Sequence, residues 1–170
     1  MKLQDIASLA EIVGGVAVIV SLVFVGVQVN DNTAAIRSAA ASDATTTMQS
    51  WYIQMGGNRQ ASDTWFNAMI SPEPLPPRDE FQFMMSMHVA ILGMQNSYLL
   101  TKEGTLDAEF REAVTTAIVG VKQLPGMDRY WRQRRAFFHA EFAEYVDELL
   151  TRDTAPTVDI YKIPEVAPDQ

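Results

Sequence analysis

The chain has 170 residues, a formal net charge of −8 and no cysteine, a length that suits one domain or one domain with an appendage. The lack of cysteine excludes disulfide frameworks, thiolate metal sites, iron–sulfur clusters and cysteine nucleophiles. The acidic balance argues against nucleic acid as a partner, because phosphate contacts need an excess of Lys and Arg.

The first predicted element is a long apolar helix. Residues Ile12–Val29 carry no charged side chain, and in the wider run Ala7–Val29 only Glu11 is charged. At about 1.5 Å per residue, the 23 residues of the wider run span about 35 Å, enough for a hydrocarbon core of about 30 Å. We therefore predict a transmembrane anchor over residues 1–32. A cleaved signal peptide and a buried helix of a soluble protein are the alternatives.

Small residues share one face of this helix. Ala10, Gly14, Ala17 and Ser21 follow one another at spacings of four, three and four. Small side chains let helix backbones approach closely in lipid, so this pattern predicts a packing face toward another membrane helix. The ordinary composition of membrane helices is the alternative explanation.

The rest of the chain predicts helices and no strand. A helix is expected over Ala34–Met55, either continuous with the anchor or separate from it, and Gly56-Gly57-Asn58 ends it. The others run from Ser62 or Asp63 to Ile70, from Arg78 to Lys102, from Asp107 to the Pro125-Gly126 pair, and over Asp128–Leu150 with a break near His139. We therefore predict an all-α fold: one transmembrane helix, a bundle of about five helices over residues 33–152, and an extended tail over residues 153–170.

The segment Phe81–Leu100 is apolar on nearly all sides, which predicts a central, buried helix. Its methionines are Met84, Met85, Met87 and Met94. Such a cluster suits an adaptable core, which we favour, or a binding surface. His88 lies among them, and we expect a core or interface histidine with one satisfied ring nitrogen.

Basic and aromatic residues gather in one later stretch of the otherwise acidic chain. They are Arg129, Trp131, Arg132, Arg134 and Arg135. The pattern predicts a contact with an acidic partner or with anionic lipid headgroups, and Trp131 could serve as an anchor at the membrane interface. The alternative is a solvated helix face paired with Glu141 and Glu144.

No catalytic or metal-binding motif is present. Neither His88 nor His139 belongs to a Glu-x-x-His or His-Glu-x-x-His motif, and there is no Gly-x-Ser-x-Gly or phosphate-binding glycine loop. We expect no catalytic residues, no metal and no cofactor.

Three stretches together resemble a family of uncharacterised bacterial single-pass membrane proteins with a small C-terminal helical domain. The stretches are Gln28-Val29-x-x-Asn32-Thr33-x-Ala35 after the apolar helix, Gln95-Asn96-x-Tyr98 with Glu103-Gly104-x-Leu106-Asp107, and Trp131-x-x-Arg134-Arg135-x-x-Phe138 with Phe142-x-x-Tyr145-Val146. The resemblance implies a single-pass protein of the bacterial inner (cytoplasmic) membrane with its helical domain in the cytoplasm.

These features predict a membrane-anchored helical interaction module, an accessory or scaffolding subunit without catalytic function. Its expected partners are other membrane protein subunits and membrane lipid. The alternative is a membrane-tethered sensor of a lipid or small molecule, with the methionine-rich helix lining a pocket. The tail motif Tyr161-Lys162-Ile163-Pro164 is a candidate docking peptide.

Overall fold

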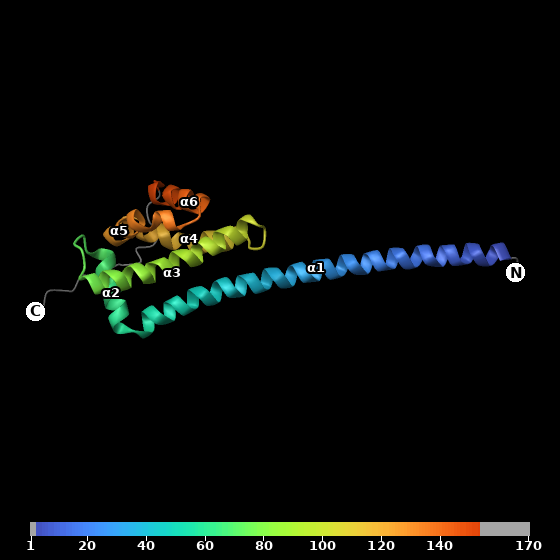
Figure 1. Cartoon of the computed structure of the whole chain (residues 1–170), viewed down its shortest axis with the longest axis horizontal. Coiled ribbons are helices and arrows are strands. Elements are labelled where there is room, and N and C mark those ends of the chain that lie inside the picture. The colour runs from blue at the N-terminus through green and yellow to red at the C-terminus, as the bar shows by residue number, and fades with distance from the viewer. Residues whose placement is uncertain (1–2, 154–170) are drawn as a thin grey trace, which may run out of the picture. The chain divides into compact units, whose positions relative to one another are not determined.

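The computed structural model describes residues 3–153, without the side chains of residue 3 and residues 5–9. Within that range the chain is all-helical and contains no strand, which confirms the predicted fold class (Figure 1). The helices are α1 (Leu3–Gly57), α2 (Arg59–Ile70), α3 (Pro77–Lys102), α4 (Ala108–Val121), α5 (Pro125–Arg134), the 3-10 helix η1 (Arg135–Phe137) and α6 (Ala140–Thr151). Residues 154–170, including the candidate docking motif at 161–164, lie outside the described residues.

The chain divides into two units, residues 1–40 and residues 41–170. The first unit consists of the N-terminal part of α1. The second holds the C-terminal end of α1 together with α2–α6. The predicted end of the anchor, residue 32, falls inside the first unit and stays a prediction.

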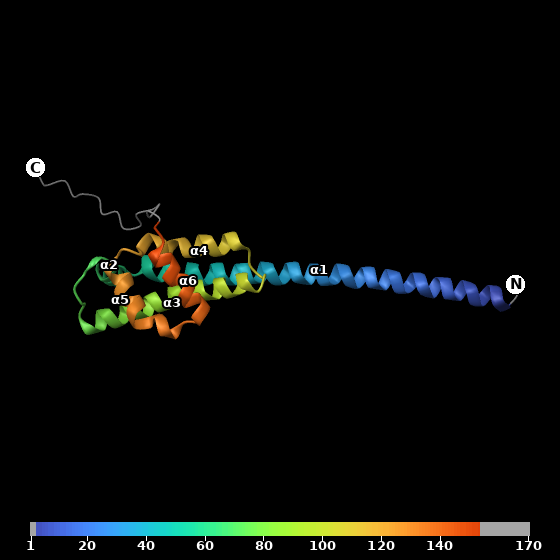
Figure 2. The same cartoon turned by 90° about the horizontal axis from the view of Figure 1, so that it is seen from above.

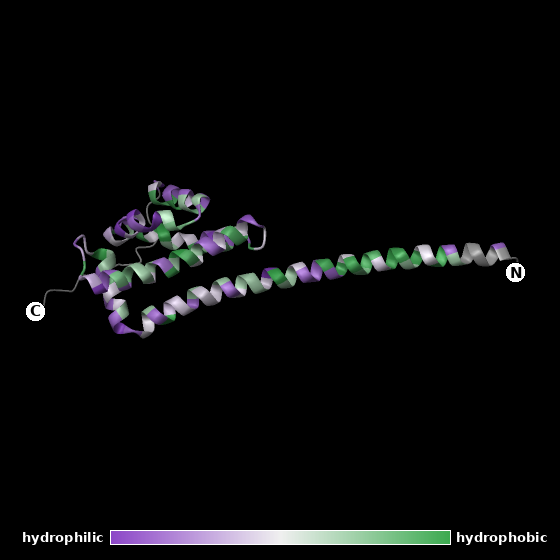
Figure 3. Ribbon diagram, in the orientation of Figure 1, coloured by the Kyte–Doolittle hydropathy of each residue, from purple (hydrophilic) through white to green (hydrophobic). Residues whose placement is uncertain are grey.

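The N-terminal unit exposes its apolar side chains. The large apolar residues between Ile12 and Val29 are 52–66% exposed, and they give this part of α1 its hydrophobic colour in Figure 3. Among the described helices, α1 alone has a segment long and apolar enough to cross a membrane, and none of its most apolar stretch is buried. By length and composition alone, a signal sequence or the core helix of a soluble protein would meet the same criterion as a membrane-spanning helix.

The start of α2 differs from the prediction. We expected Ser62 or Asp63 to cap this helix, but α2 begins at Arg59 and Asn58 is its cap. The Asn58 side-chain oxygen accepts a hydrogen bond from the backbone N–H of Ala61 at 3.1 Å, which satisfies a donor that the first turn leaves free. The helix therefore starts directly after the glycine pair.

The end of α3 depends on Gly104, whose φ of 74° lies in the left-handed region. This conformation brings the N–H groups of Thr105 and Leu106 to the carbonyl oxygen of Leu100, at 2.8 and 3.1 Å. It also turns Leu106 into the core, where that side chain is buried. Gly104 therefore closes this helix and directs the chain toward α4.

The predicted break near His139 is confirmed. The chain leaves the helical conformation at Phe138, and α6 starts at Ala140 with His139 as its N-cap residue. On the two sides of this break the buried apolar residues are Trp131, Phe138, Phe142, Val146 and Leu149.

The second unit is organised around α3, which contacts α2, α4, α5 and α6 (Figures 1 and 2). Phe83, Met84, Met87, Ile91 and Met94 of this helix belong to the core, so the prediction of a central helix and of a methionine-containing core is confirmed. The C-terminal end of α1 is tied to α3 by the Trp51 indole N–H, which donates to the carbonyl of Ser86 at 2.9 Å.

One face of α3 is an exception to this burial. A helix that is apolar on all sides is expected to be buried on all sides. Phe81, Val89 and Leu92, however, are 65%, 49% and 40% exposed. With the half-buried Met85 they follow one another at spacings of four, four and three, and therefore share a face. The described helices cover this apolar stripe only in part, since Met85 packs against the core while Val89 and Leu92 line a shallow hollow beside the end of α1.

A close backbone approach joins α5 to α2. A Cβ atom at Gly126 would lie 2.5 Å from the carbonyl oxygen of Ala68 and 2.6 Å from Cα of Met69. Both neighbours are backbone atoms, so no side-chain movement can relieve the contact. Glycine at this position is what lets α5 pack against the end of α2.

We therefore expect Gly126→Ala to lower the free energy of unfolding by about 1–3 kcal/mol, because the new methyl group forces the two backbones apart. The matched control is Gly93→Ala, whose Cβ would meet side-chain atoms of Thr47 and Met48 at 3.6 and 3.7 Å, an ordinary contact distance. The control should be neutral or stabilising because alanine favours helix. Thermal unfolding of the full chain, followed by circular dichroism, measures both, and equal effects would contradict the packing.

Candidate functional site

The second unit contains an apolar cavity of about 150 Å³ between the end of α1 and helices α2, α3 and α4. Each helix contributes side chains from one face, at helical spacings of three or four. The lining residues are Met48, Trp51, Tyr52, Trp65, Met69, Met87, Ala90, Ile91, Met94, Ala117, Ile118 and Val121. The predicted methionine-rich helix therefore lines a pocket as well as filling the core.

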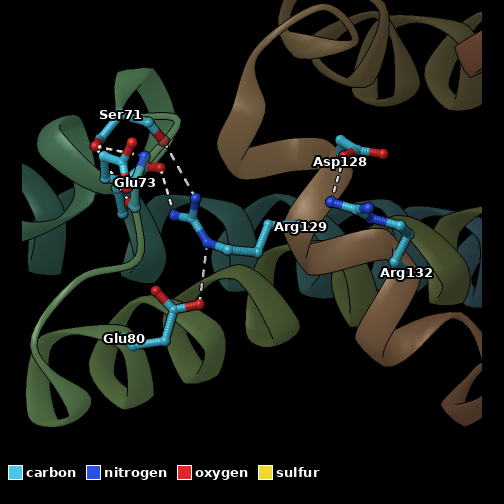
Figure 4. Close-up of polar contacts among 7 residues, drawn as sticks. Ser71, Glu73, Glu80, Asp128, Arg129 and Arg132 are labelled. Atoms are coloured by element: carbon cyan, nitrogen blue, oxygen red, sulfur yellow. Dashed lines mark hydrogen bonds and ion pairs between the residues drawn. The ribbon is translucent and has the colours of Figure 1, made fainter.

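The arginine-rich stretch does not form one surface, because its first member points inward. The Arg129 side chain is 13% exposed, and its guanidinium donates to Glu80 at 3.1 Å (Figure 4). It also donates to the carbonyl oxygens of Ser71 at 3.2 Å and Ala68 at 2.8 Å. Arg129 thus satisfies orphan carbonyls at the C-terminal end of α2 and joins α2, α3 and α5.

Trp131 is also an interior residue, only 6% exposed. Its indole N–H donates to Asp147 at 2.8 Å, and the other oxygen of Asp147 accepts from Arg135 at 2.7 and 2.9 Å. The Arg135 hydrogen bonds, with that of Trp131, hold the pKa of Asp147 below its usual value. Asp147 thereby links α5 and η1 to α6.

The two remaining arginines lie nearer the surface. Arg132 is exposed and pairs with Asp128 one turn earlier, at 2.7 Å (Figure 4). The Arg134 guanidinium lies over the ring of Phe137, 5.2 Å from its centre. Glu141, expected as a partner of this stretch, pairs instead with Lys102 of α3.

The predicted contact surface is therefore corrected for two of its five members. Arg129 and Trp131 turn into the bundle, where each finds hydrogen-bond acceptors on other helices, so neither is presented to a headgroup or a partner. Arg132, Arg134 and Arg135 remain at or near the surface, and a partner contact through these three stays a prediction.

The His88 ring meets the expectation of one satisfied nitrogen. Its Nδ1 lies 2.9 Å from the hydroxyl of Tyr130, a fully buried side chain. Burial, and secondly the nearby charge of Arg134, lower the pKa of His88 below its ordinary 6.5. Burial raises the pKa of the Tyr130 hydroxyl, which stays protonated. His88 and Tyr130 therefore form a hydrogen bond between neutral groups, which joins α3 to α5.

The predicted packing face lies on the exposed part of α1. Ala10, Gly14, Ala17 and Ser21 are all exposed, and a Cβ added at Gly14 would meet nothing within 4 Å. The Ser21 hydroxyl donates to the carbonyl of Ala17 at 2.9 Å, so it is satisfied within the helix. This face is free of contacts from the described residues of the chain.

Within residues 3–153, no group of three or more His, Asp or Glu side chains could hold a metal ion. Comparisons of the chain with family models, with curated proteins and with solved structures found no match. The resemblance to bacterial single-pass membrane proteins stays a prediction.

Sequence reasoning missed the cavity residues that lie outside α3. Trp51 and Trp65 are 14 positions apart in the chain, and their rings meet edge to face with centres 4.9 Å apart. The only signal was the helical spacing of large apolar residues on each segment, and that spacing does not reveal which faces meet.

The structure assigns different roles to neighbouring arginines, and a pair of variants tests this. Arg129→Met should lower the free energy of unfolding by about 3 kcal/mol, because Glu80 then lies half-buried without its cation. Arg132→Met should change the free energy of unfolding by less than about 0.5 kcal/mol, because its ion pair is exposed to solvent. Urea titration of both variants measures the difference, and a larger effect at Arg132 would contradict the assignment.

His88 also predicts a pH dependence of stability. As pH falls through about 6.5, the unfolded chain takes up a proton on this residue before the folded chain does. The free energy of unfolding should therefore fall on acidification in this range. His88→Gln removes this contribution, so the loss of melting temperature between about pH 8 and about pH 5 should be smaller in the variant. The quantity compared is the change of melting temperature with pH, not the melting temperature itself. Equal changes in the native chain and in His88→Gln would contradict the lowered pKa of His88.

Proposed function

We propose that this chain is a membrane-anchored helical interaction module, a non-catalytic accessory or scaffolding subunit of a larger bacterial membrane protein complex. In this proposal the apolar part of α1 crosses the membrane once and contacts other membrane subunits. The bundle of α2–α6 with the end of α1 is the domain outside the bilayer.

The exposed apolar segment of α1 carries this proposal. Its 18 residues from Ile12 to Val29 span about 27 Å, close to the thickness of a hydrocarbon core. Covering a large apolar side chain is favourable by about 1.5–3 kcal/mol, so a helix that exposes a whole segment of them in water is strongly disfavoured. A bilayer covers such a segment on all sides and leaves its backbone hydrogen bonds intact.

The small-residue face gives the anchor a second role. Lipid covers an apolar helix equally well on every side, and therefore does not require small residues on one of them. A neighbouring helix does, because association in lipid depends on close packing. Gly14 and Ala17 have no packing role toward the described residues of their own chain, which supports a partner helix on this face.

The exposed stripe on α3 supports a contact outside the bilayer as well. Phe81, Val89 and Leu92 place apolar area on the domain's surface, and exposed apolar patches of this kind mark interaction sites. The cytoplasmic location of the domain rests on the family resemblance alone. The absence of catalytic motifs in the sequence supports a non-catalytic role.

The alternative function, a tethered sensor of a lipid or small molecule, is supported by one observation. That observation is the apolar cavity lined by methionines of α1, α2 and α3.

Site-specific photocrosslinking tests the packing face. A photoreactive amino acid at Ala17 should give an adduct with another membrane protein in native membranes. The same amino acid at Ile19, which lies about 200° away around the helix, should react with lipid only. Gly14→Leu should abolish the Ala17 adduct, because the longer side chain holds the partner backbone away.

The matched control for that substitution is Ile12→Leu, on the face opposite the small residues, and the adduct should survive it. Adducts of equal yield at Ala17 and Ile19, or an Ala17 adduct unaffected by Gly14→Leu, would contradict a partner on this face.

A further inference from the structure

The cavity between the end of α1 and helices α2, α3 and α4 is partly open to solvent, since its lining residue Tyr52 is exposed. Its volume is about 150 Å³. Alanines at positions 90 and 117 line it where a larger apolar side chain would fill it. The space is therefore kept open by small side chains on two helices.

The lining contains no charged side chain and is mostly apolar. All its side chains are aliphatic, aromatic or thioether. The Trp51 N–H already donates to the carbonyl of Ser86, and Tyr52 is 60% exposed. Ordered water needs two to four polar partners and this lining offers few, so the cavity suits an uncharged, apolar occupant.

Two features of the lining favour an aromatic ring. Engineered apolar cavities of about 150 Å³ bind benzene, so the volume matches one such ring. Trp51 and Trp65 form an edge-to-face wall with ring centres 4.9 Å apart, and aromatic rings prefer this geometry among themselves. Methionine sulfurs, which make favourable contacts with ring edges, come from Met48, Met69, Met87 and Met94.

We propose that this cavity is a binding site for a single uncharged aromatic ring, presented by a small molecule. The site lies within residues 48–121, so the proposal is independent of the membrane anchor and of its partner helix.

Occupancy of the site also couples the ligand to α1. Met48, Trp51 and Tyr52 of α1 form one wall, and α2, α3 and α4 supply the others. A bound ring adds contacts between these walls. Ligand binding therefore favours the docked state of the end of α1, the same helix that carries the apolar segment.

Methyl NMR of the full-length protein in lipid nanodiscs tests the proposal, with benzene as the probe. The chain has nine methionines, each of which can carry a labelled methyl group. Benzene should produce saturable shifts at Met48, Met69, Met87 and Met94, because ring currents act over short distances. The signals of Met84, Met85 and Met127, which do not line the cavity, should stay in place and serve as internal controls.

Ala117→Leu should weaken benzene binding at least tenfold by filling the cavity. Ala113→Leu is the matched control, since it adds the same group at an exposed position one turn earlier on α4, and should leave binding unchanged. The methyl map of the native chain tests the site even if Ala117→Leu fails to fold.

Three results would overturn the proposal. The first is an absence of saturable shifts, and the second is shifts spread equally over lining and non-lining methionines. The third uses a lipid that carries a spin label at the end of its acyl chain. If this lipid broadens the methyl signals of the four lining methionines, and benzene does not reduce the broadening, the proposal fails. That last result would assign the cavity to an acyl chain instead of a ring.

Discussion

The need to cover the apolar segment of α1 dominates the behaviour of this protein. Residues Ile12–Val29 present apolar side chains all around the helix, and none of its most apolar stretch is buried by the described chain. In the proposed function a bilayer covers this surface on every side. The proposed role of the small-residue face follows from this, because helices surrounded by lipid associate through close packing of their backbones.

In the second unit, polar groups determine how the helices are joined. Arg129 connects three helices by donating to Glu80 and to carbonyls of α2, and Asp147 connects α6 to the segment before it. Residues of the arginine-rich stretch therefore stabilise the bundle. The stretch looks like a cationic surface in the sequence, but Arg129 and Arg135 pair with acids on α3 and α6, Arg132 pairs with Asp128 on its own helix, and Arg134 lies over the Phe137 ring.

Helix α3 has two different environments around its axis. One side fills the core and also lines the cavity, since Met87, Ile91 and Met94 belong to both, and the other side, with Phe81 and Val89, remains exposed. Apolar periodicity cannot distinguish these environments, because both carry the same kinds of side chain. The cavity and the exposed stripe are thus the two places where the apolar content of α3 exceeds what the core of this unit uses.

The sequence by itself determined the all-α class, the long apolar helix, the central position of α3 and the break near His139, because local periodicity, proline and glycine act over a few residues. It placed the start of α2 too late, since it did not recognise the Asn58 cap. Only the tertiary structure decided which side chains meet. It turned Arg129 and Trp131 inward and brought Trp51 to Trp65, because the partners that hold these residues come from helices distant in the chain, and contact between distant segments leaves no local pattern.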